Sequence, residues 1–491
     1  MDPPSQANGG RPMISDEEEA ASLLLEKVIP PTLLKESAGD KCCCIFRIPH
    51  TLGRANYTAY EPKIVSIGPY HRTGNKEHLK MIEEHKKRYL EIFVSKTKDK
   101  GVTLSHLVDA VSGLEQKIRD AYSENLDFNQ QKLIKVMILD GCFILMLFLV
   151  VSREIEYTKF NDPIFKLRWI LPTLRSDLLL LENQVPLFLL NDLLEVSKLT
   201  LSTSLNEMAF KFFNYSIKKP EEFWEKHKNL RAKHLLDLIR KTFIPVGSSS
   251  TTQKQCCINI FSGPGENSRT ETPKNTCLGK MCCSKETTGT QTSSHPPPLP
   301  RPFLGLIVSA RKLRLQGIKF KRRETVETPL DIIFKSGLVE IPLLIFDDFI
   351  SSLLINCVAF EQFNMKCSTE ITSYVTFMGC LINTEEDATF LVEKGIIENY
   401  FGTGEDVSFF FKNIGKNIAF SISTSFLANV FEGLNEYTSQ GCHVHWAGFK
   451  YTHFNTPWTF LSSFAALMLL LLTIFQAFFA ASAYFRPPKN N

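Results

Sequence analysis

The chain has 491 residues, 44% hydrophobic and 22% charged, which is the balance of a globular protein long enough for more than one domain. Its net charge of +4 is small, and no basic stripe is interleaved with aromatic residues, so we expect no nucleic-acid partner. Phe is frequent, with 38 residues against 12 Tyr and 4 Trp, which indicates a large apolar core rather than a particular chemistry.

Residues 1–40 are polar and acidic, and we expect them to be disordered. They contain no signal peptide, because the acidic run Asp16–Glu19 stands where a basic region should precede an apolar one. The cysteines, 13 in all, are clustered rather than spaced as a disulfide framework, which fits a reducing compartment. The triplet Cys42–Cys44 is interpreted as buried or free thiol, with acylation as the alternative.

Residues 57–71 predict an extended segment that ends in a turn, because Pro62, Gly68 and Pro69 bracket an alternating apolar stretch. His71 beside this turn is a candidate catalytic or binding residue, although no acid or nucleophile stands at a recognisable spacing from it. Two amphipathic helices follow, with apolar faces over 79–93 and 104–118.

Residues 128–152 contain a long apolar run, which we interpret as the central buried helix of the domain. Asp140 and Gly141 stand at the start of that run, and its uninterrupted part is too short to cross a bilayer. A lone buried carboxylate is costly, so we expect Asp140 to accept a hydrogen bond from a neighbouring backbone group.

Residues 172–197 predict a helix that breaks at Val185-Pro186, because the residue before proline is driven out of the α region. Glu182, Asn183 and Gln184 precede the break and are expected to bond the backbone groups that it frees. A catalytic role for Glu182 is the alternative. Two further core helices are predicted near 205–213 and 235–239.

Residues 245–303 form a linker in which more than half of residues 247–302 are Ser, Thr, Pro or Gly. Such a stretch buries too little apolar surface to offset chain entropy, so we expect disorder. Its cysteines suggest a zinc sensor, but they are spaced CC…C…CC rather than as paired CxxC motifs, and no metal site is expected. These residues are Cys256, Cys257, Cys277, Cys282 and Cys283.

Residues 304–456 predict a short helix over 309–316, strands over 318–322, 330–334 and 337–346 in a small antiparallel sheet, and then helices. Thr384 is a predicted cap for a helix that Gly395 ends. His443, His445 and His453 are interpreted as incidental histidines of a membrane-proximal loop rather than metal ligands.

Phe460–Phe485 carries no charge and is long enough to cross a membrane, which takes about 20 residues. Its Leu, Ile and Phe side chains favour insertion by about −6 kcal/mol in total. Trp446, Tyr451 and Trp458 lie before it, as in an interfacial aromatic belt. Residues 486–491 form a short tail, and its cations slightly favour a cytosolic position for the C-terminus. The absence of a signal peptide favours the opposite orientation, with the bulk of the chain in the cytosol.

No nucleophile elbow, dinucleotide fingerprint, phosphate-binding loop, zinc-protease motif or EF-hand loop is present. Two glycosylation sequons, at Asn56 and Asn214, are interpreted as chance occurrences because both lie in segments expected to be packed. The sequence therefore offers no catalytic, cofactor-binding or metal-ligating residue set.

Several short motifs, in this order along the chain, resemble the plant family called domain of unknown function 247, which carries a UPF membrane-protein label. The motifs are Ala59–Pro62, Val65–His71, Lys86–Leu90, Leu139–Ile144, Asp177–Pro186, Gly317–Phe320, Leu330–Ile332, Ile341-Pro342, Ala359–Gln362, Ile371–Tyr374 and Pro457-Trp458. The resemblance implies a largely helical protein with one C-terminal transmembrane segment and no assigned catalytic residue. Some members are linked to recognition between pollen and stigma, which implies a binding or signalling role. The long insert at 247–302 departs from the family pattern.

We therefore predict a mainly α protein, with a small antiparallel β element and one C-terminal transmembrane helix. Its parts are a disordered N-terminus (1–40), a helical part (41–244), the linker (245–303), an α+β remainder (304–456), the span (460–485) and the tail (486–491). The two halves flanking the linker are expected to share one core.

The leading hypothesis is a non-enzymatic interaction, recognition or signalling protein, tethered as a single-pass membrane protein with its bulk in the cytosol and a protein as its partner. The alternative is an enzyme of unrecognised type. Its candidate catalytic residues are Asp140, Asp177, Glu182, Glu361 and His71, and it gains support only if their carboxylates converge.

Overall fold

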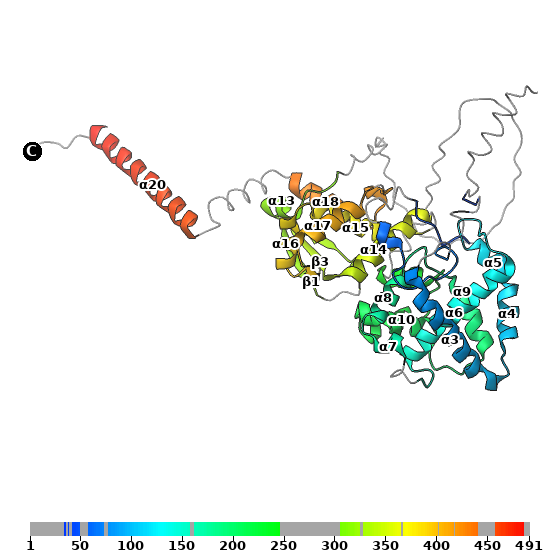
Figure 1. Cartoon of the computed structure of the whole chain (residues 1–491). Coiled ribbons are helices and arrows are strands. Elements are labelled where there is room, and N and C mark those ends of the chain that lie inside the picture. The colour runs from blue at the N-terminus through cyan, green and yellow to red at the C-terminus, as the bar shows by residue number, and fades with distance from the viewer. Residues whose placement is uncertain are drawn as a thin grey trace, which may run out of the picture.

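The computed structural model describes a mainly helical protein (Figure 1). The described residues are 34–35, 38, 42–49, 57–72, 77–157, 162–245, 305–324, 328–364, 367–400, 402–416, 418–439 and 457–485.

The first half of the chain is built around one long helix, α6 (Gln130–Ser152), most of whose side chains are buried. The side chain of Asn129 caps its first turn by accepting a hydrogen bond from the backbone of Lys132. Helices α3, α4, α9 and α10 pack around α6. The helices of this half are α3 (Lys80–Thr97), α4 (Leu104–Gly113), α5 (Glu115–Asp120), α7 (Pro163–Lys166), α8 (Ile170–Asp177), α9 (Leu187–Ser197), α10 (Leu205–Ile217), α11 (Glu221–His227) and α12 (Leu235–Phe243). The predicted central helix is thus confirmed.

The second half combines helices with short strands. Its helices are α13 (Ala310–Leu315), α14 (Asp348–Phe363), α15 (Glu370–Leu381), α16 (Glu385–Glu393), α17 (Gly404–Ile414) and α18 (Ala428–Ser439), and its strands are β1 (Lys319–Arg323), β2 (Ile333–Lys335), β3 (Leu338–Pro342), β4 (Leu344–Phe346) and β5 (Ile397–Asn399). Thr384 caps α16 in a reciprocal capping box with Asp387, as predicted. Gly395 follows this helix at φ +66°, the left-handed conformation that favours glycine.

The predicted antiparallel sheet is wrong in topology. Strand β2 does pair antiparallel with β3, because Ser336 and Gly337 both have positive φ and close a tight hairpin. Strand β1, however, pairs with the other edge of β3 in parallel, and β4 pairs in parallel with β5. Pairing partners far apart in the sequence decide these directions, and periodicity within one strand cannot indicate them.

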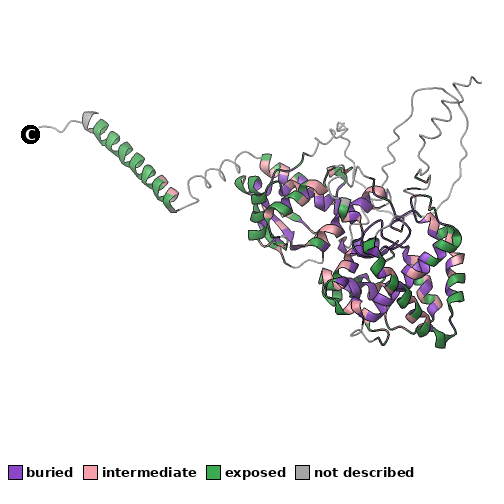
Figure 2. Cartoon of the chain, viewed as in Figure 1, coloured by how far each residue is buried: buried purple, intermediate pink, exposed green. Residues whose placement is uncertain are grey.

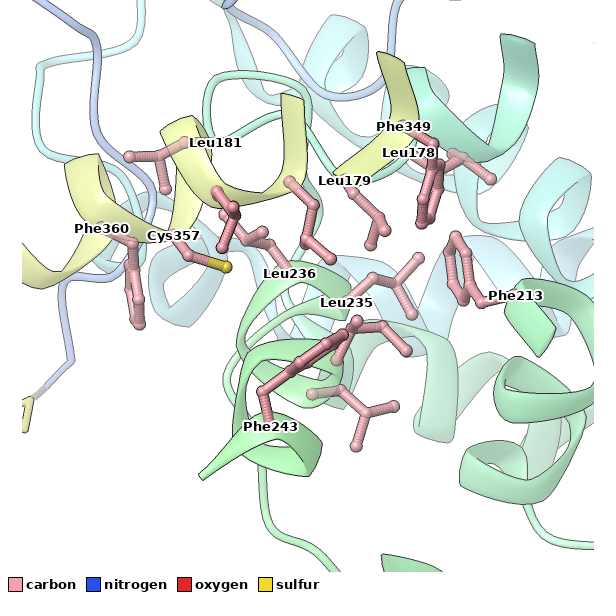
Figure 3. Packing of buried hydrophobic residues seen from close by; sticks show 14 of the residues in the cluster. Leu178, Leu179, Leu181, Phe213, Leu235, Leu236, Phe243, Phe349, Cys357 and Phe360 are labelled. Carbon is pink, nitrogen blue, oxygen red and sulfur yellow. The ribbon is translucent and has the colours of Figure 1, made fainter. Parts of the chain in front are cut away.

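The two halves share one hydrophobic core. Figure 3 shows Leu178, Leu179 and Leu181, from the first half, beside α12 and beside Phe349, Cys357 and Phe360 of α14. The side chain of Asn356 extends this contact, because its Oδ1 accepts from the backbone of Leu181 at 2.8 Å and its Nδ2 donates to the carbonyl of Ala59 at 3.1 Å. The two halves that flank residues 246–304 therefore form one folded body.

Two described helices are long and apolar enough to cross a membrane, α6 and the C-terminal α20 (Pro457–Phe485). They differ in burial. The most apolar window of α6 is 83% buried inside the folded body, whereas that of α20 is 0% buried, and Figure 2 draws most of the described part of α20 as exposed. Only α20 leaves its apolar surface uncovered.

Candidate functional site: a buried polar cluster around residues 63–72

Residues 63–72 form no helix or strand, yet most of them are buried. A buried segment without regular structure needs partners for its backbone N–H and C=O groups. Side chains from α3, α6 and the segment after α8 provide these partners. We call these side chains and residues 63–72 together the polar cluster.

Asp177, the last residue of α8, binds the start of this segment. Its carboxylate accepts backbone N–H groups of Lys63 (2.9 Å), Ile64 (2.8 Å) and Val65 (3.0 Å). Burial raises the pKa of Asp177 to about 6, and the three N–H donors act in the opposite direction by stabilising the ionised form. The carboxylate therefore caps a turn.

Asn183 and Gln184 continue this role, as predicted for the helix break. Asn183 accepts from the backbone of Ile67 at 2.6 Å and donates to the carbonyls of Val65 and Asp177. Gln184 donates to the carbonyls of Leu178 (2.7 Å) and Leu180 (2.8 Å), just after the end of α8. Helix α9 begins only at Leu187, so the predicted single broken helix is two helices.

Asp140 on α6 is fully buried and is the anionic centre of the cluster. It accepts from the backbone of Gly68 at 2.8 Å, as expected, and also from two cations, Lys86 at 2.7 Å and Arg72 at 2.5 Å. Lys86 is itself fully buried and donates to Glu83 at 2.5 Å. Two cations and two carboxylates thus neutralise one another, which makes burial of the charges tolerable.

Glu182 and His71 complete the cluster. Glu182 accepts the backbone N–H of Ile48 at 2.6 Å, and its second oxygen lies 3.3 Å from the ring nitrogen Nε2 of His71. Glu182 therefore binds the N-terminal segment. Its predicted bond to backbone freed at the break stays a prediction. His71 is only 6% exposed.

Glu361 lies in a separate buried cluster on α14. It accepts from Arg240 of α12 at 2.8 Å and from both the backbone and the hydroxyl of Thr372 at 2.7 Å. Burial raises the pKa of Glu361, and Arg240 and Thr372 counteract this rise. Arg240 also pairs with Glu370 at 3.4 Å and so connects α12 to α14 and α15.

The five candidate catalytic residues are therefore divided between two places. Asp140, Asp177, Glu182 and His71 lie around residues 63–72, and Glu361 lies apart in the Arg240 cluster. Each carboxylate is bonded to backbone N–H groups, to a cation or to both. Among the described residues no group of three or more His, Cys, Asp or Glu side chains is placed to hold a metal ion. The arrangement fits a structural role.

Sequence reasoning missed the cations that hold these carboxylates, and one signal was available. Lys86 follows Ile82 by four residues and precedes Tyr89 by three, so it lies on the apolar face of α3. A cation at such a position indicates a buried ion pair. Arg240 gave the same signal, because it follows Leu236 by four residues and precedes Phe243 by three on the apolar face of α12. Arg72 lies outside any helix and gave no such signal.

Several other predicted sites can be placed. Cys42 is exposed, while Cys43 and Cys44 are buried. The side chain of the sequon residue Asn214 donates to the carbonyl of Lys219 and accepts from its N–H. It thereby binds the backbone that follows the end of α10. The linker cysteines, the other sequon, Trp446, Tyr451 and the three C-terminal histidines lie outside the described residues.

Comparisons with known proteins agree with the sequence motifs. The chain is 47% identical to the UPF0481 protein At3g47200 of Arabidopsis thaliana over 449 residues, which cover 91% of this chain and 88% of that one. It is 23% identical to a second UPF0481 protein of that plant, At3g02645, over 88% of this chain and 89% of that one. No solved structure matches the chain significantly. Residues 45–472 match the sequence profile of DUF247, described as a plant protein of unknown function, so the chain belongs to this family.

Proposed function

We propose that this protein is a non-enzymatic interaction protein, tethered to a membrane by α20 and acting in recognition or signalling. The observation that supports the tether is the uncharged surface of α20. Its side chains from Leu461 to Ser482 lie outside the folded body, including Leu470 at 57% exposure and Phe478 at 66%. An apolar helix of this length is stable when lipid covers it.

The few polar groups of α20 are compatible with a membrane. The hydroxyl of Thr473 donates to the carbonyl of Leu469 at 2.7 Å, and that of Ser462 donates to the carbonyl of Thr459 at 3.1 Å. These bonds within the helix lower the cost of placing hydroxyls in hydrocarbon. Trp458 is 79% exposed at the start of α20, the position of an interfacial anchor.

The non-enzymatic part of the proposal is supported by the clusters described above. Their carboxylates bond the protein's own backbone and cations, and no catalytic motif is present in the sequence. The bulk of the chain is proposed to lie in the cytosol, with another protein as its partner.

The tether is tested by placing two arginines at the centre of α20, Leu470→Arg with Ile474→Arg, in the full chain. Each arginine costs about 3 kcal/mol at the centre of a span, so the pair offsets the insertion energy of about −6 kcal/mol. We expect alkaline carbonate to extract this variant from plant membranes. The matched variant, Leu470→Val with Ile474→Val, should stay in the membrane pellet. Retention of the arginine variant in the pellet would count against the tether.

A further inference from the structure

Helix α13 and strand β1 form the most basic stretch of the described chain. Residues 311–323 contain no Asp or Glu. Their cations are Arg311, Lys312, Arg314, Lys319, Lys321, Arg322 and Arg323. A two-residue turn, Gln316-Gly317, and Ile318 separate helix and strand. Helix α13 packs against α16, and Arg314 lies 5.2 Å from the ring of Phe390 on that helix.

The three-stranded sheet has one covered face and one basic face. Phe320 is buried and its ring meets the ring of Phe390 on α16. Its neighbours Lys319 and Lys321 point to the opposite face, because side chains alternate along a strand. The register places Lys335 of β2 on this same face, since Lys335 and Lys319 both pair with Leu338. All three lysines are exposed.

Most of these charges have no carboxylate partner among the described residues. Arg323 pairs with Asp331 at 3.0 Å, and Arg311 lies 3.8 Å from Glu386. The other cations have no ion pair within the described part of the chain, namely Lys312, Arg314, Lys319, Lys321, Arg322 and Lys335. Glu340, opposite Lys321 in the register, is the carboxylate of the basic face. The charge of the face is therefore positive and unbalanced.

Exposed apolar side chains accompany the cations. Leu315, at the end of α13, is 43% exposed, and Leu306 and Val308 just before α13 are 65% and 39% exposed. Cations beside exposed leucines are typical of surfaces that rest on a lipid bilayer, where the cations meet headgroups and the leucines enter the interface.

The last described helix before α20 packs on the covered face of the same sheet, since Phe334 and Phe320 both pair with Val339. Helix α18 packs against β2, with the ring of Tyr437 on that of Phe334, and it ends at Ser439. Residues 440–456 join it to α20 at Pro457. A chain of that length reaches at most about 60 Å when fully extended. A body so tethered stays within reach of the membrane that holds α20.

We propose that the basic face of the sheet, formed by Lys319, Lys321 and Lys335, docks on the anionic phospholipid headgroups of the membrane that holds α20. The proposal rests on the proposed tether. Anionic lipid is the occupant that the tether itself supplies at a high local concentration, whereas an acidic protein or a nucleic acid would have to arrive from solution. The contact is expected on a cytosolic leaflet, which is the leaflet rich in anionic lipid.

The test reconstitutes the full chain into two kinds of vesicle, phosphatidylcholine alone and phosphatidylcholine mixed with phosphatidylserine. A water-soluble amine reagent then labels lysines, and mass spectrometry measures the rate at each. We expect Lys319, Lys321 and Lys335 to react at least about fivefold more slowly in the anionic vesicles, and high salt to remove the difference. Lys198, exposed just after α9, and Lys211, exposed on α10, should react equally in both.

Charge reversal sharpens the test. In the variant Lys319→Glu with Lys321→Glu, Lys335 should lose its protection in anionic vesicles. It should keep its protection in the matched variant Lys198→Glu with Lys211→Glu. Equal labelling of the basic face in both kinds of vesicle, for a protein that floats with them, would overturn this inference alone. A protein that fails to float with either vesicle would overturn the tether, and this inference with it.

Discussion

At the scale of single residues, buried ion pairs determine which substitutions destabilise the fold most. Asp140, Lys86 and Arg240 are each at most 1% exposed, and each is held by partners of opposite charge. Removing one member of such a set leaves the other charged and buried, which costs far more than the pair itself contributes. The buried carboxylates of these sets are therefore sensitive positions for stability.

The substitution Asp140→Asn should destabilise the fold by about 3–5 kcal/mol, because Lys86 and Arg72 lose their shared anion. Thermal and urea unfolding of the purified protein, followed by circular dichroism, measure the change. The same substitution at Asp109, exposed on α4, should alter the unfolding free energy by less than about 0.5 kcal/mol. Equal effects at the two sites would show that the buried charge is not what matters.

His234 makes stability depend on pH. It is fully buried, its Nδ1 accepts the backbone N–H of Asp237, and its other nitrogen lies 3.0 Å from the carbonyl of Cys44. Burial lowers the pKa of His234 to about 4 from its ordinary 6.5. The unfolded chain therefore binds this proton first, and the contribution of His234 to stability is complete above pH 6.5 and is lost toward pH 4.

The size of this loss is roughly 3 kcal/mol. Asp177 acts in the opposite sense, because its raised pKa makes its contribution grow as the pH falls below about 6. Comparing wild type with His234→Asn between pH 7 and 4 isolates the histidine, since Asn keeps a capping oxygen without a titrating group. The variant should lose less stability than wild type over this range, and parallel curves would contradict the assignment.

At the scale of elements, the close approach of two irregular segments fixes the polar cluster. Gly68 has φ +72°, and a Cβ there would lie 2.6 Å from the carbonyl oxygen of Gln184 and 3.0 Å from the hydroxyl of Tyr122. That hydroxyl donates to the same carbonyl at 2.9 Å. Only glycine lets residues 63–72 pack this closely against the segment between α8 and α9.

Two glycine substitutions separate the cost of a side chain at positive φ from the cost of a steric clash with neighbouring atoms. Gly101→Ala should cost about 1–2 kcal/mol, since Gly101 has φ +73° but no heavy atom within 4 Å of a new Cβ. Gly68→Ala should cost a further 1–3 kcal/mol, roughly, for displacing Gln184 and Tyr122. Chemical denaturation measures both changes. Similar losses of unfolding free energy in the two variants would mean that Gln184 and Tyr122 move away from a new Cβ at residue 68 at little cost.

At the scale of the whole molecule, Arg240 helps hold the two halves together. Cleavage at a protease site inserted within residues 246–304 should leave the halves of wild type associated, because their core is continuous. In Arg240→Met the carboxylates of Glu361 and Glu370 lose their cation, at a cost of about 3–5 kcal/mol, and we expect the cleaved halves to separate. Gel filtration after cleavage distinguishes the two results.

The control for this experiment is Arg311→Met, because Arg311 forms an exposed pair with Glu386. Exposed pairs contribute at most about 1 kcal/mol, so its cleaved halves should remain together. Separation in both variants would trace the effect to the cleavage, and association in both would show that apolar contacts suffice.

The sequence by itself determined what depends on local pattern. Apolar periodicity located α3 and α4, a long apolar run located α6, the predicted cap at Thr384 located α16, and an uncharged run located α20. Ordered motifs identified the family. Each of these signals lies within a short window, where the period of a helix or the chemistry of a cap is complete.

Only the tertiary structure decided which distant groups meet. It showed that β1 runs parallel to β3, that Lys86 and Arg72 neutralise Asp140, and that Arg240 connects α12 to α14. It also confirmed that α6 is the buried one of the two apolar helices, since other helices cover α6 and not α20. Composition sets how apolar a helix is, but whether protein covers it depends on packing across the whole chain.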